Sequence, residues 1–198
     1  MKVSIIKYNA GNIQSVLFAL ERIGINATVT DDIEVLKKSD KIIFPGVGEA
    51  SSAMNYLRER NLDEVITSLT QPVLGICLGM QLMCQYSEEG NTSCLGIFDS
   101  KVKLFPANLK NIKVPQIGWN TIYDLKTNLY QNIKENEYQY FVHSYYVELC
   151  EHTIAKTNCA LEYSSSLHKN NFYATQFHPE KSSDSGQRIL ENFIRNTK

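Results

Sequence analysis

The sequence contains no hydrophobic run near the roughly 18 residues that a membrane-spanning helix needs. It also has no excess of positive charge, since 20 basic side chains stand against 21 acidic ones and the formal net charge is -1. A chain without a broad positive field is poorly suited to bind nucleic-acid phosphates or an anionic membrane. The opening residues, MKVSIIKYNA, predict a short strand and lack the apolar region and cleavage site of a signal peptide. We therefore expect a cytoplasmic protein that binds neither nucleic acid nor membranes.

Closely spaced cysteine pairs are also absent. The five cysteines are an odd number and none of them forms a C-x-x-C pair. This pattern disfavours a disulfide-stapled fold and a zinc-ribbon site, so we expect reduced thiols. The composition itself, 43% hydrophobic and 21% charged over 198 residues, is that of an ordinary globular protein and fits one domain spanning 1–198.

The first half of the sequence alternates between strand and helix patterns. Short apolar runs at 3–7, 27–30, 42–44 and 73–76 predict buried strands, each followed by hydrophobic residues at helical spacing. Asp31 or Asp32 is a candidate N-cap for a short helix through Lys38. A helix after the fourth strand is predicted from the spacing of Leu78, Leu82, Met83 and Tyr86. Strands that alternate with helices indicate a parallel sheet with helices on both faces.

The second half has a different pattern. Between 101 and 163, short strand-like segments are separated by Asn, Lys and Gly turns, which predicts antiparallel hairpins added to the parallel core. A further strand is predicted at 172–177, directly before His178. The last predicted helix has one hydrophobic face, formed by Ile189, Leu190, Phe193 and Ile194. The expected fold is therefore α/β, with a mostly parallel central sheet, helices on both faces and added hairpins.

A G-x-C-x-G pattern, formed by Gly75, Cys77 and Gly79, lies at the predicted junction between the fourth strand and its helix. It is the nucleophile-elbow pattern G-x-S-x-G with sulfur in place of oxygen. The glycines permit a sharp turn, and free N–H groups at the start of a helix favour a thiolate. The N–H of Leu78 is then placed to bind an oxyanion. A buried cysteine between two packing glycines explains the pentapeptide alone equally well.

A second motif, His178-Pro179-Glu180, follows the last predicted strand. On an extended chain, residues two apart point to the same side, so the Glu180 carboxylate can orient the His178 imidazole as in a catalytic triad. Taken alone, the motif is more typical of a structural histidine at a strand end. It gains weight from the elbow, because both are predicted at one edge of a parallel sheet, where open α/β folds bind ligands.

A glycine-rich segment, 45-PGVGEA-50, connects the third predicted strand to a helix. Its two glycines permit backbone conformations that point N–H groups into a cleft. Val47 or Gly48 is therefore a candidate second donor to an oxyanion. The segment by itself is more typical of a connection made only for tight turning.

These three motifs, in this order, resemble those of the class I (triad) glutamine amidotransferases. The resemblance runs along the whole chain and is greatest to the glutaminase subunits of imidazole glycerol phosphate synthases. The segments that carry it are 7-KYNAGN-12, 45-PGVGEA-50, 74-LGICLGMQLM-83, 114-VPQIGWN-120, 141-FVHSYY-146 and 176-QFHPEKS-182. The resemblance implies a flavodoxin-like version of the α/β fold described above.

The resemblance also implies roles for individual residues. Cys77 would be the nucleophile, His178 the acid and base, and Glu180 the orienting carboxylate of a glutaminase that needs no metal or organic cofactor. The residues matching glutamine-binding positions are Gly46, Gln81, Glu89, Ser144 and Tyr145. Tyr140 and Lys181 match positions that face a partner. That partner would be a (β/α)8-barrel cyclase, which forms a heterodimer with the glutaminase and uses its ammonia to make imidazole glycerol phosphate and an aminoimidazole carboxamide ribotide in histidine biosynthesis. We expect the isolated chain to have low activity.

Two departures from the family pattern leave alternatives open. Asn9 stands where these proteins usually have glycine, and Gln116 stands where they usually have histidine. The same glutaminase could therefore supply ammonia to another synthase, such as one that amidates a sugar nucleotide. A cysteine hydrolase of related fold and a non-enzymatic thiol redox sensor are further alternatives. Among the remaining candidates, Cys84 is expected in the core, and His143 is equally compatible with a structural and a substrate-lining role.

Overall fold

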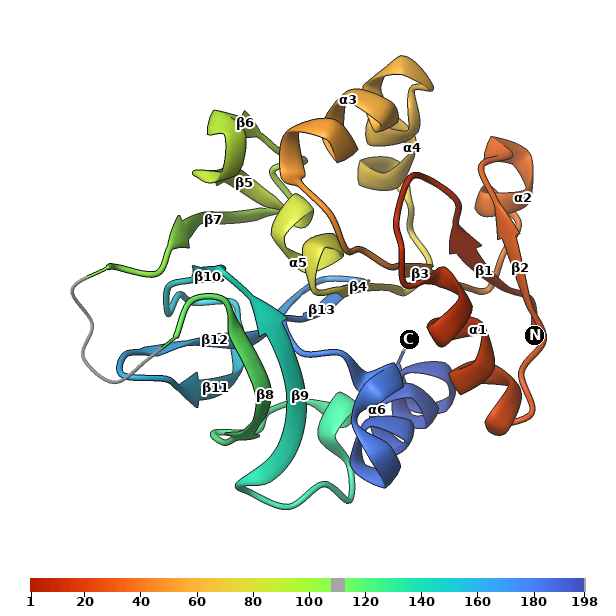
Figure 1. The fold of residues 1–198 in the computed structure, drawn as a ribbon. Helices are drawn as coiled ribbons and strands as arrows, with labels where there is room; N and C mark the ends of the chain where they lie inside the picture. The colour runs from red at the N-terminus through yellow and green to blue at the C-terminus, as the bar shows by residue number, and fades with distance from the viewer. Residues whose placement is uncertain (108–112, 198) are drawn as a thin grey trace.

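The computed structural model describes residues 1–107 and 113–197, so 108–112 of the predicted hairpin region lie outside the described residues. One half of its main sheet is parallel (Figure 1). The strands of this half run in the order β2 (Ala27–Thr30), β1 (Val3–Ile6), β3 (Lys41–Phe44), β4 (Val73–Ile76) and β13 (Phe172–Thr175). The order 2-1-3-4 followed by a late strand is that of a flavodoxin-like doubly wound sheet, as predicted.

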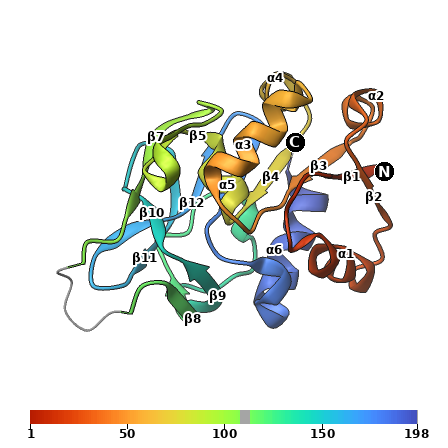
Figure 2. The ribbon, with the colours of Figure 1, turned by 45° about the horizontal axis from the view of Figure 1, so that its top comes forward.

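Helices cover both faces of this parallel half (Figure 2). One face carries α1 (Ile13–Arg22) and α6 (Ser183–Asn196), and the other carries α2 (Ile33–Lys37), α3 (Ala50–Glu59), α4 (Leu62–Ser68) and α5 (Leu78–Met83). Side chains alternate between the two cores, because successive residues of a strand point to opposite faces. Ile5 and Ile43 pack with α1 and α6, whereas Ile6, Ile42 and Phe44 pack with the other four helices.

The start of α2 confirms the predicted cap. An Asp32 side-chain oxygen accepts hydrogen bonds from the N–H groups of Glu34 (2.8 Å) and Val35 (3.1 Å). These N–H groups would otherwise lack partners in the first turn of the helix. Of the two aspartates proposed from the sequence, Asp32 is the N-cap.

The helix predicted from Leu78 through Tyr86 is too long. It ends at Met83, and Cys84–Ser87 form strand β5. Cys84 is extended (φ -70°, ψ 176°), and its carbonyl accepts the N–H of Gly96 at 2.8 Å instead of continuing the helix. Pairing with later strands thus overrides the helical spacing. Cys84 is nevertheless buried in the core, as expected.

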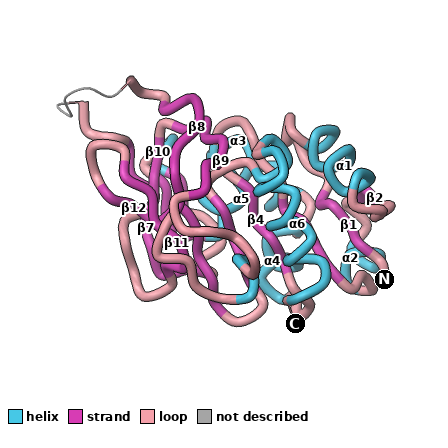
Figure 3. Tube along the Cα trace, turned by 90° about the horizontal axis from the view of Figure 1, so that it is seen from below, coloured by secondary structure: helices cyan, strands magenta, loops and turns pink. Residues whose placement is uncertain are grey.

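The other half of the sheet is mostly antiparallel and lies beside the helix-covered half (Figure 3). Beyond β13 the order continues through β12 (Glu162–Lys169), β10 (Tyr145–Val147), β7 (Phe98–Leu104), β5 and β6 (Thr92–Ser93), and β11 (Thr153–Asn158) pairs with β12. Among the described strands of this half, β5 and β7 are the one pair that runs in parallel. Short 3-10 turns lie at Glu89–Asn91, Asn128–Tyr130 and Pro179–Lys181. The predicted added hairpins are confirmed.

A separate two-stranded ribbon, β8 (Gln116–Ile122) with β9 (Glu137–His143), completes the fold. One of its faces is buried, with Ile122, Phe141 and Gln139 inaccessible to solvent. The opposite face exposes Ile117 and Trp119. The ribbon therefore follows the alternation of a sheet with one covered face, but its open face is apolar rather than polar.

Across residues 1–107 and 113–197, no helix combines the length and apolar character that a membrane span requires.

Candidate active site

Cys77 occupies a strained turn between β4 and α5. Its dihedral angles, φ 53° and ψ -108°, are rarely adopted by a residue that carries a Cβ. Close packing on both sides requires the flanking glycines. A Cβ on Gly79 would overlap the carbonyl oxygen of Phe44, and one on Gly75 would lie 2.9 Å from Sδ of Met83. The turn therefore has the geometry of a nucleophile elbow, in which the side chain projects beyond the edge of the sheet.

The neighbouring strand brings the second motif to the same edge. β13 pairs in parallel with β4, with Thr175 opposite Ile76. The N–H of Cys77 donates to the carbonyl of Thr175 at 2.7 Å. Because parallel strands end at a common edge, the residues that follow β13, Gln176 to His178, lie beside Cys77 although they are about a hundred positions later in the sequence.

His178 and Glu180 form a buried pair. Nδ1 of His178 lies 2.8 Å from Oε1 of Glu180, and neither side chain is accessible to solvent. The two residues meet across the 3-10 turn at Pro179–Lys181, whereas the sequence predicted an extended chain here. Asn12, which precedes α1, also donates to Oε1 of Glu180 at 3.0 Å through its side-chain amide. The carboxylate is thus held from two directions.

The charges around His178 favour its protonated form. Burial alone lowers the pKa of an imidazole, but the neighbouring Cys77 sulfur and the Glu180 carboxylate outweigh burial and raise the pKa of His178 above its usual value. Nε2 of His178 has no hydrogen-bond partner among the described residues. The Cys77 sulfur itself lies 3.7 Å from the carbonyl oxygen of Val142. Nε2 is therefore the ring nitrogen left to exchange a proton with a group bound at Cys77.

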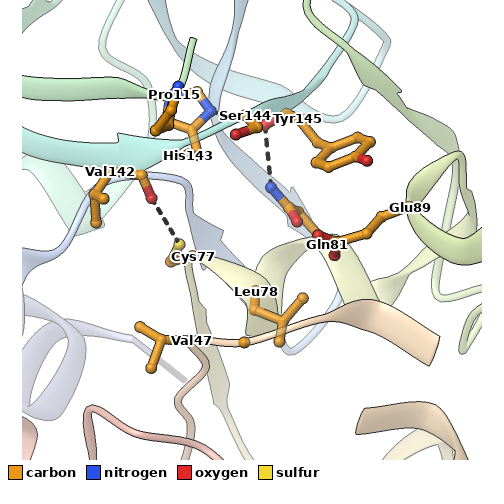
Figure 4. Close-up of a pocket in the computed structure, with 11 residues that line it drawn as sticks. Val47, Cys77, Leu78, Gln81, Glu89, Pro115, Val142, His143, Ser144 and Tyr145 are labelled. Atoms are coloured by element: carbon orange, nitrogen blue, oxygen red, sulfur yellow. Dashed lines mark hydrogen bonds between the residues drawn. The ribbon is translucent and has the colours of Figure 1, made fainter. Parts of the chain in front are cut away.

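A cavity of about 260 Å³ opens in front of Cys77 (Figure 4). Its walls include most of the residues proposed from the sequence, namely Val47, Gly48, Cys77, Leu78, Gln81, Glu89, Ser144 and Tyr145. Pro115, Val142 and His143 complete the lining. His178 and Glu180 do not line the cavity. The structure thus brings the candidate nucleophile and the candidate substrate-binding residues into one space.

The two remaining groups of predicted site residues lie outside this lining. Gly46 is buried behind the cavity wall, where its carbonyl accepts the N–H of Leu78 at 3.3 Å. Lys181 is exposed and Tyr140 is half-buried, near the ribbon formed by β8 and β9. The N–H proposed as an oxyanion donor is therefore bonded within the protein in this structure.

The loop at 45–48 has a second internal anchor. The Tyr8 hydroxyl donates to the carbonyl of Pro45 at 2.5 Å. Burial, and then the charge of the nearby Cys77, raise the pKa of Tyr8 far above its usual value, so its hydroxyl stays protonated and acts as a donor. Tyr8 lies in one of the segments that carry the family resemblance, but no sequence pattern predicts this contact.

One end of the cavity is polar. The Glu89 carboxylate accepts the N–H of Ala50, at the start of α3, at 2.8 Å, and burial raises its pKa. The side-chain nitrogen of Gln81 donates to the main-chain carbonyl of Tyr145 at 3.1 Å and to Oε1 of Gln176 at 3.0 Å. The side-chain oxygen of Gln81 is therefore the atom left to bind a ligand.

His143, whose role was open, both lines the cavity and belongs to a buried network. Its Nδ1 lies 2.7 Å from the carbonyl of Tyr145, and its Nε2 lies 3.1 Å from the hydroxyl of Tyr163. Burial is the main cause that lowers its pKa to about 4, so the ring is neutral near pH 7. Gln116, one of the two departures from the family pattern, lies 2.9 Å from the same Tyr163 hydroxyl. It is thus part of the wall that supports His143.

Among the residues that the structure describes, no cluster of three or more His, Cys, Asp or Glu side chains could hold a metal ion.

Comparison with known proteins gives a consistent result. The glutamine amidotransferase class-I family model matches residues 4–197. A Bacteroides fragilis protein named imidazole glycerol phosphate synthase subunit HisH is 59% identical over 98% of this chain and 99% of its own. A Haemophilus influenzae protein of the same name is 45% identical over 98% of this chain and 97% of its own. A solved glutamine amidotransferase, 17% identical, superposes with a TM-score of 0.75 over 98% of this chain and 100% of its own.

Proposed function

Because the chain belongs to the class-I glutamine amidotransferase family, we propose that it is the glutaminase subunit of an imidazole glycerol phosphate synthase. In this role it hydrolyses glutamine to glutamate and ammonia. The observation that carries the proposal is the placement of Cys77 on the cavity wall, with the His178–Glu180 pair brought to the same sheet edge by the neighbouring strand. Two relatives with this name, matched over nearly their whole lengths, support the choice of synthase. The same matches favour reading 1–198 as one domain, and we propose that this domain is cytoplasmic.

The proposed reaction begins with attack of the Cys77 thiolate on the carboxamide carbon of glutamine. His178 gives its Nε2 proton to the departing nitrogen, which leaves as ammonia, and a γ-glutamyl thioester remains on the sulfur. His178 then accepts a proton from a water molecule, whose oxygen attacks the thioester, and glutamate and the thiolate are released. Glu180 holds the imidazole in position and stabilises its protonated state throughout.

Glutamine would be held by the polar end of the cavity. The free side-chain oxygen of Gln81 and the Glu89 carboxylate suit its α-ammonium group, and both line the same space as Cys77. Ser144 and Tyr145 form the facing wall (Figure 4). We assign all four residues to substrate binding.

The oxyanion donors require a change in the loop at 45–48. The N–H of Leu78 is bonded to the Gly46 carbonyl, and the peptide between Gly46 and Val47 points that carbonyl, rather than the Val47 N–H, toward Leu78. We infer that rotation of this peptide frees Leu78 and turns the Val47 N–H toward the cavity. The resting arrangement stabilises the transition state poorly, which accounts for the low activity expected of the isolated chain.

Ammonia released into neutral water is mostly protonated and no longer a nucleophile, so the product must pass directly to an acceptor enzyme. The open face of the β8–β9 ribbon suits such a partner. It exposes 63% of Ile117, 52% of Trp119 and 59% of Tyr138, and it continues to Val142 at the cavity. An exposed apolar strip of this kind marks an interaction site. We propose that a cyclase subunit binds here as a heterodimer, with Tyr140 and Lys181 at the contact.

The test is glutamate release by the pure chain, alone and with the cyclase subunit and its nucleotide ligand. We expect low activity alone and stimulation of at least tenfold in the full mixture. A chain that hydrolyses glutamine but is not stimulated by this cyclase would favour another synthase, an alternative that Asn9 and Gln116 keep open. A chain without glutaminase activity in any mixture would contradict the proposal.

A further inference from the structure

Gln176 contacts the reacting sulfur but has no part in the function proposed above. It follows β13 directly, and its side chain is completely buried. Its Nε2 lies 3.6 Å from Sγ of Cys77. A buried amide is costly unless its polar atoms have partners, so the partners of Gln176 indicate what this side chain does.

A main-chain carbonyl fixes the direction of the Gln176 amide. The carbonyl oxygen of Tyr145 can only accept a hydrogen bond, so the Gln81 atom that lies 3.1 Å from it is the amide nitrogen. This nitrogen also lies 3.0 Å from an end atom of Gln176, which must then be the oxygen. The Gln176 atom that faces the Cys77 sulfur is therefore the N–H donor. Two hydrogen bonds orient this donor, one from Gln81 to the Tyr145 carbonyl and one from Gln81 to Gln176. The carbonyl can only accept, so the direction of both bonds is set.

The sulfur has two polar neighbours with opposite preferences. The Val142 carbonyl, 3.7 Å away, can accept the proton of a neutral thiol and repels a thiolate. The Gln176 N–H interacts weakly with a neutral thiol, which is a poor acceptor, and strongly with a thiolate. The amide therefore stabilises a negative charge on the sulfur, in opposition to the Val142 carbonyl.

We propose that Gln176 is a catalytic residue that stabilises the Cys77 thiolate by an N–H to sulfur hydrogen bond, and that Gln81 positions it. The proposal rests on the proposed function, in which this thiolate attacks glutamine. Gln81 thus has two tasks, because its nitrogen orients Gln176 while its oxygen binds substrate. Gln81 therefore connects the glutamine-binding end of the cavity to the Cys77 sulfur through Gln176.

The test replaces Gln176 by Met, which keeps the length of the side chain and removes the donor, and by Asn, which keeps an amide but withdraws it from the sulfur. The rate of Cys77 alkylation by iodoacetamide is followed against pH by peptide mass spectrometry, which separates Cys77 from the other four cysteines. We expect the midpoint of the alkylation profile to rise by about one pH unit in both variants, because the thiolate loses a charge-assisted hydrogen bond.

The expected loss of activity is smaller than the roughly tenfold loss of thiolate that a one-unit rise in midpoint causes on its own. A thiolate that loses a donor becomes more nucleophilic, with a Brønsted coefficient of about 0.4–0.5. A rise of one pH unit therefore lowers kcat/KM near pH 7 by about threefold in the complex with the cyclase. A purely structural role for Gln176 would lower the melting temperature without moving the alkylation midpoint.

Gln139→Met is the matched control. Gln139 is also completely buried, but its side-chain nitrogen donates to Ser185. We expect this variant to leave the alkylation midpoint unchanged. Unchanged midpoints in both folded Gln176 variants would overturn the proposal. Failure of the proposed function would be seen in a different measurement, as absence of glutamate release by the unmodified chain with its cyclase. The alkylation profile does not depend on that measurement.

Discussion

The cavity lies between two regions that differ in how far their side chains are buried and bonded within the chain. On one side, β4 and β13 are buried along their whole lengths, and the residues after them, Cys77, Gln176 and His178, are held by hydrogen bonds within the chain. On the other side, the β8–β9 ribbon leaves an apolar face open to solvent. In the proposed function, the first region holds Cys77 and the His178–Glu180 pair already assembled in the free chain, whereas the oxyanion loop at 45–48 still has to rotate. The second region has an exposed apolar surface, which we propose a partner covers. The comparison thus separates the residues proposed to react from the residues proposed to bind the partner.

The largest effect is expected from a change in the assembled region. Glu180→Gln removes the carboxylate that helps to raise the pKa of His178 while keeping its shape. We expect glutaminase activity of the complex to fall on the order of 10³-fold. Because the carboxylate raises the pKa of His178, its loss lowers that pKa, and the basic limb of the pH–rate profile moves to lower pH. The measurement is kcat against pH in the complex.

The partner affinity of the same variant provides the control for the comparison. Glu180 is buried at the sheet edge and does not reach the open face of the ribbon. Calorimetry with the cyclase should give a Kd within about threefold of the unmodified value, since the substitution keeps the size of a side chain that is itself buried and leaves Lys181 in place. A large loss of partner affinity would contradict the separation of the two regions.

An intermediate effect is expected from the ribbon. Trp119→Ala removes a large exposed side chain that contacts the Tyr140 ring edge-on, with centroids 5.9 Å apart. Aromatic anchors of an interface typically cost 2 kcal/mol or more on truncation, so we expect Kd for the cyclase to rise about 30-fold. Phe18→Ala is the matched control, because Phe18 on α1 is equally exposed, 53% against 52%. Equal losses in the two variants would show that the ribbon is not the docking surface.

Among these three substitutions, the smallest effect is expected from Asn12. It precedes α1 but makes no capping hydrogen bond there, and its amide donates to Glu180 instead. Asn12→Ala removes one hydrogen bond to a charged group, so we expect kcat to fall roughly tenfold with little change in KM. Steady-state kinetics of the complex measure both parameters. An unchanged kcat with a lowered melting temperature would assign Asn12 a purely structural role.

The sequence predicted the parts of the fold and site that depend on local pattern. The doubly covered parallel sheet follows from alternating apolar runs, and the elbow at Cys77 follows from glycines whose neighbours leave no room for a Cβ. The end of α5 was missed because residues through Tyr86 keep helical spacing. Only pairing with segments later in the chain shows that Cys84–Ser87 form a strand.

The polar contacts made by Gln176 and Asn12 could not be predicted from sequence patterns. Gln176 is separated from Cys77 by 99 positions, and Asn12 from Glu180 by 168. Nothing in the local sequence distinguishes these amides from solvated ones. His168 shows the same limit, because nothing in its local sequence indicates that its ring, on strand β12, stacks on the ring of Tyr173.

The central claim is that Cys77 and His178, from neighbouring strand ends, act as one unit on glutamine. The most direct test labels the complex with an electrophilic glutamine analogue, such as a γ-chloroketone, and locates the adduct by peptide mass spectrometry. We predict an adduct on Cys77 alone, formed at least 100-fold more slowly in His178→Ala because the imidazolium that stabilises the attacking thiolate is lost. Equal labelling rates in the two proteins, or an adduct on one of the other four cysteines, would contradict the account.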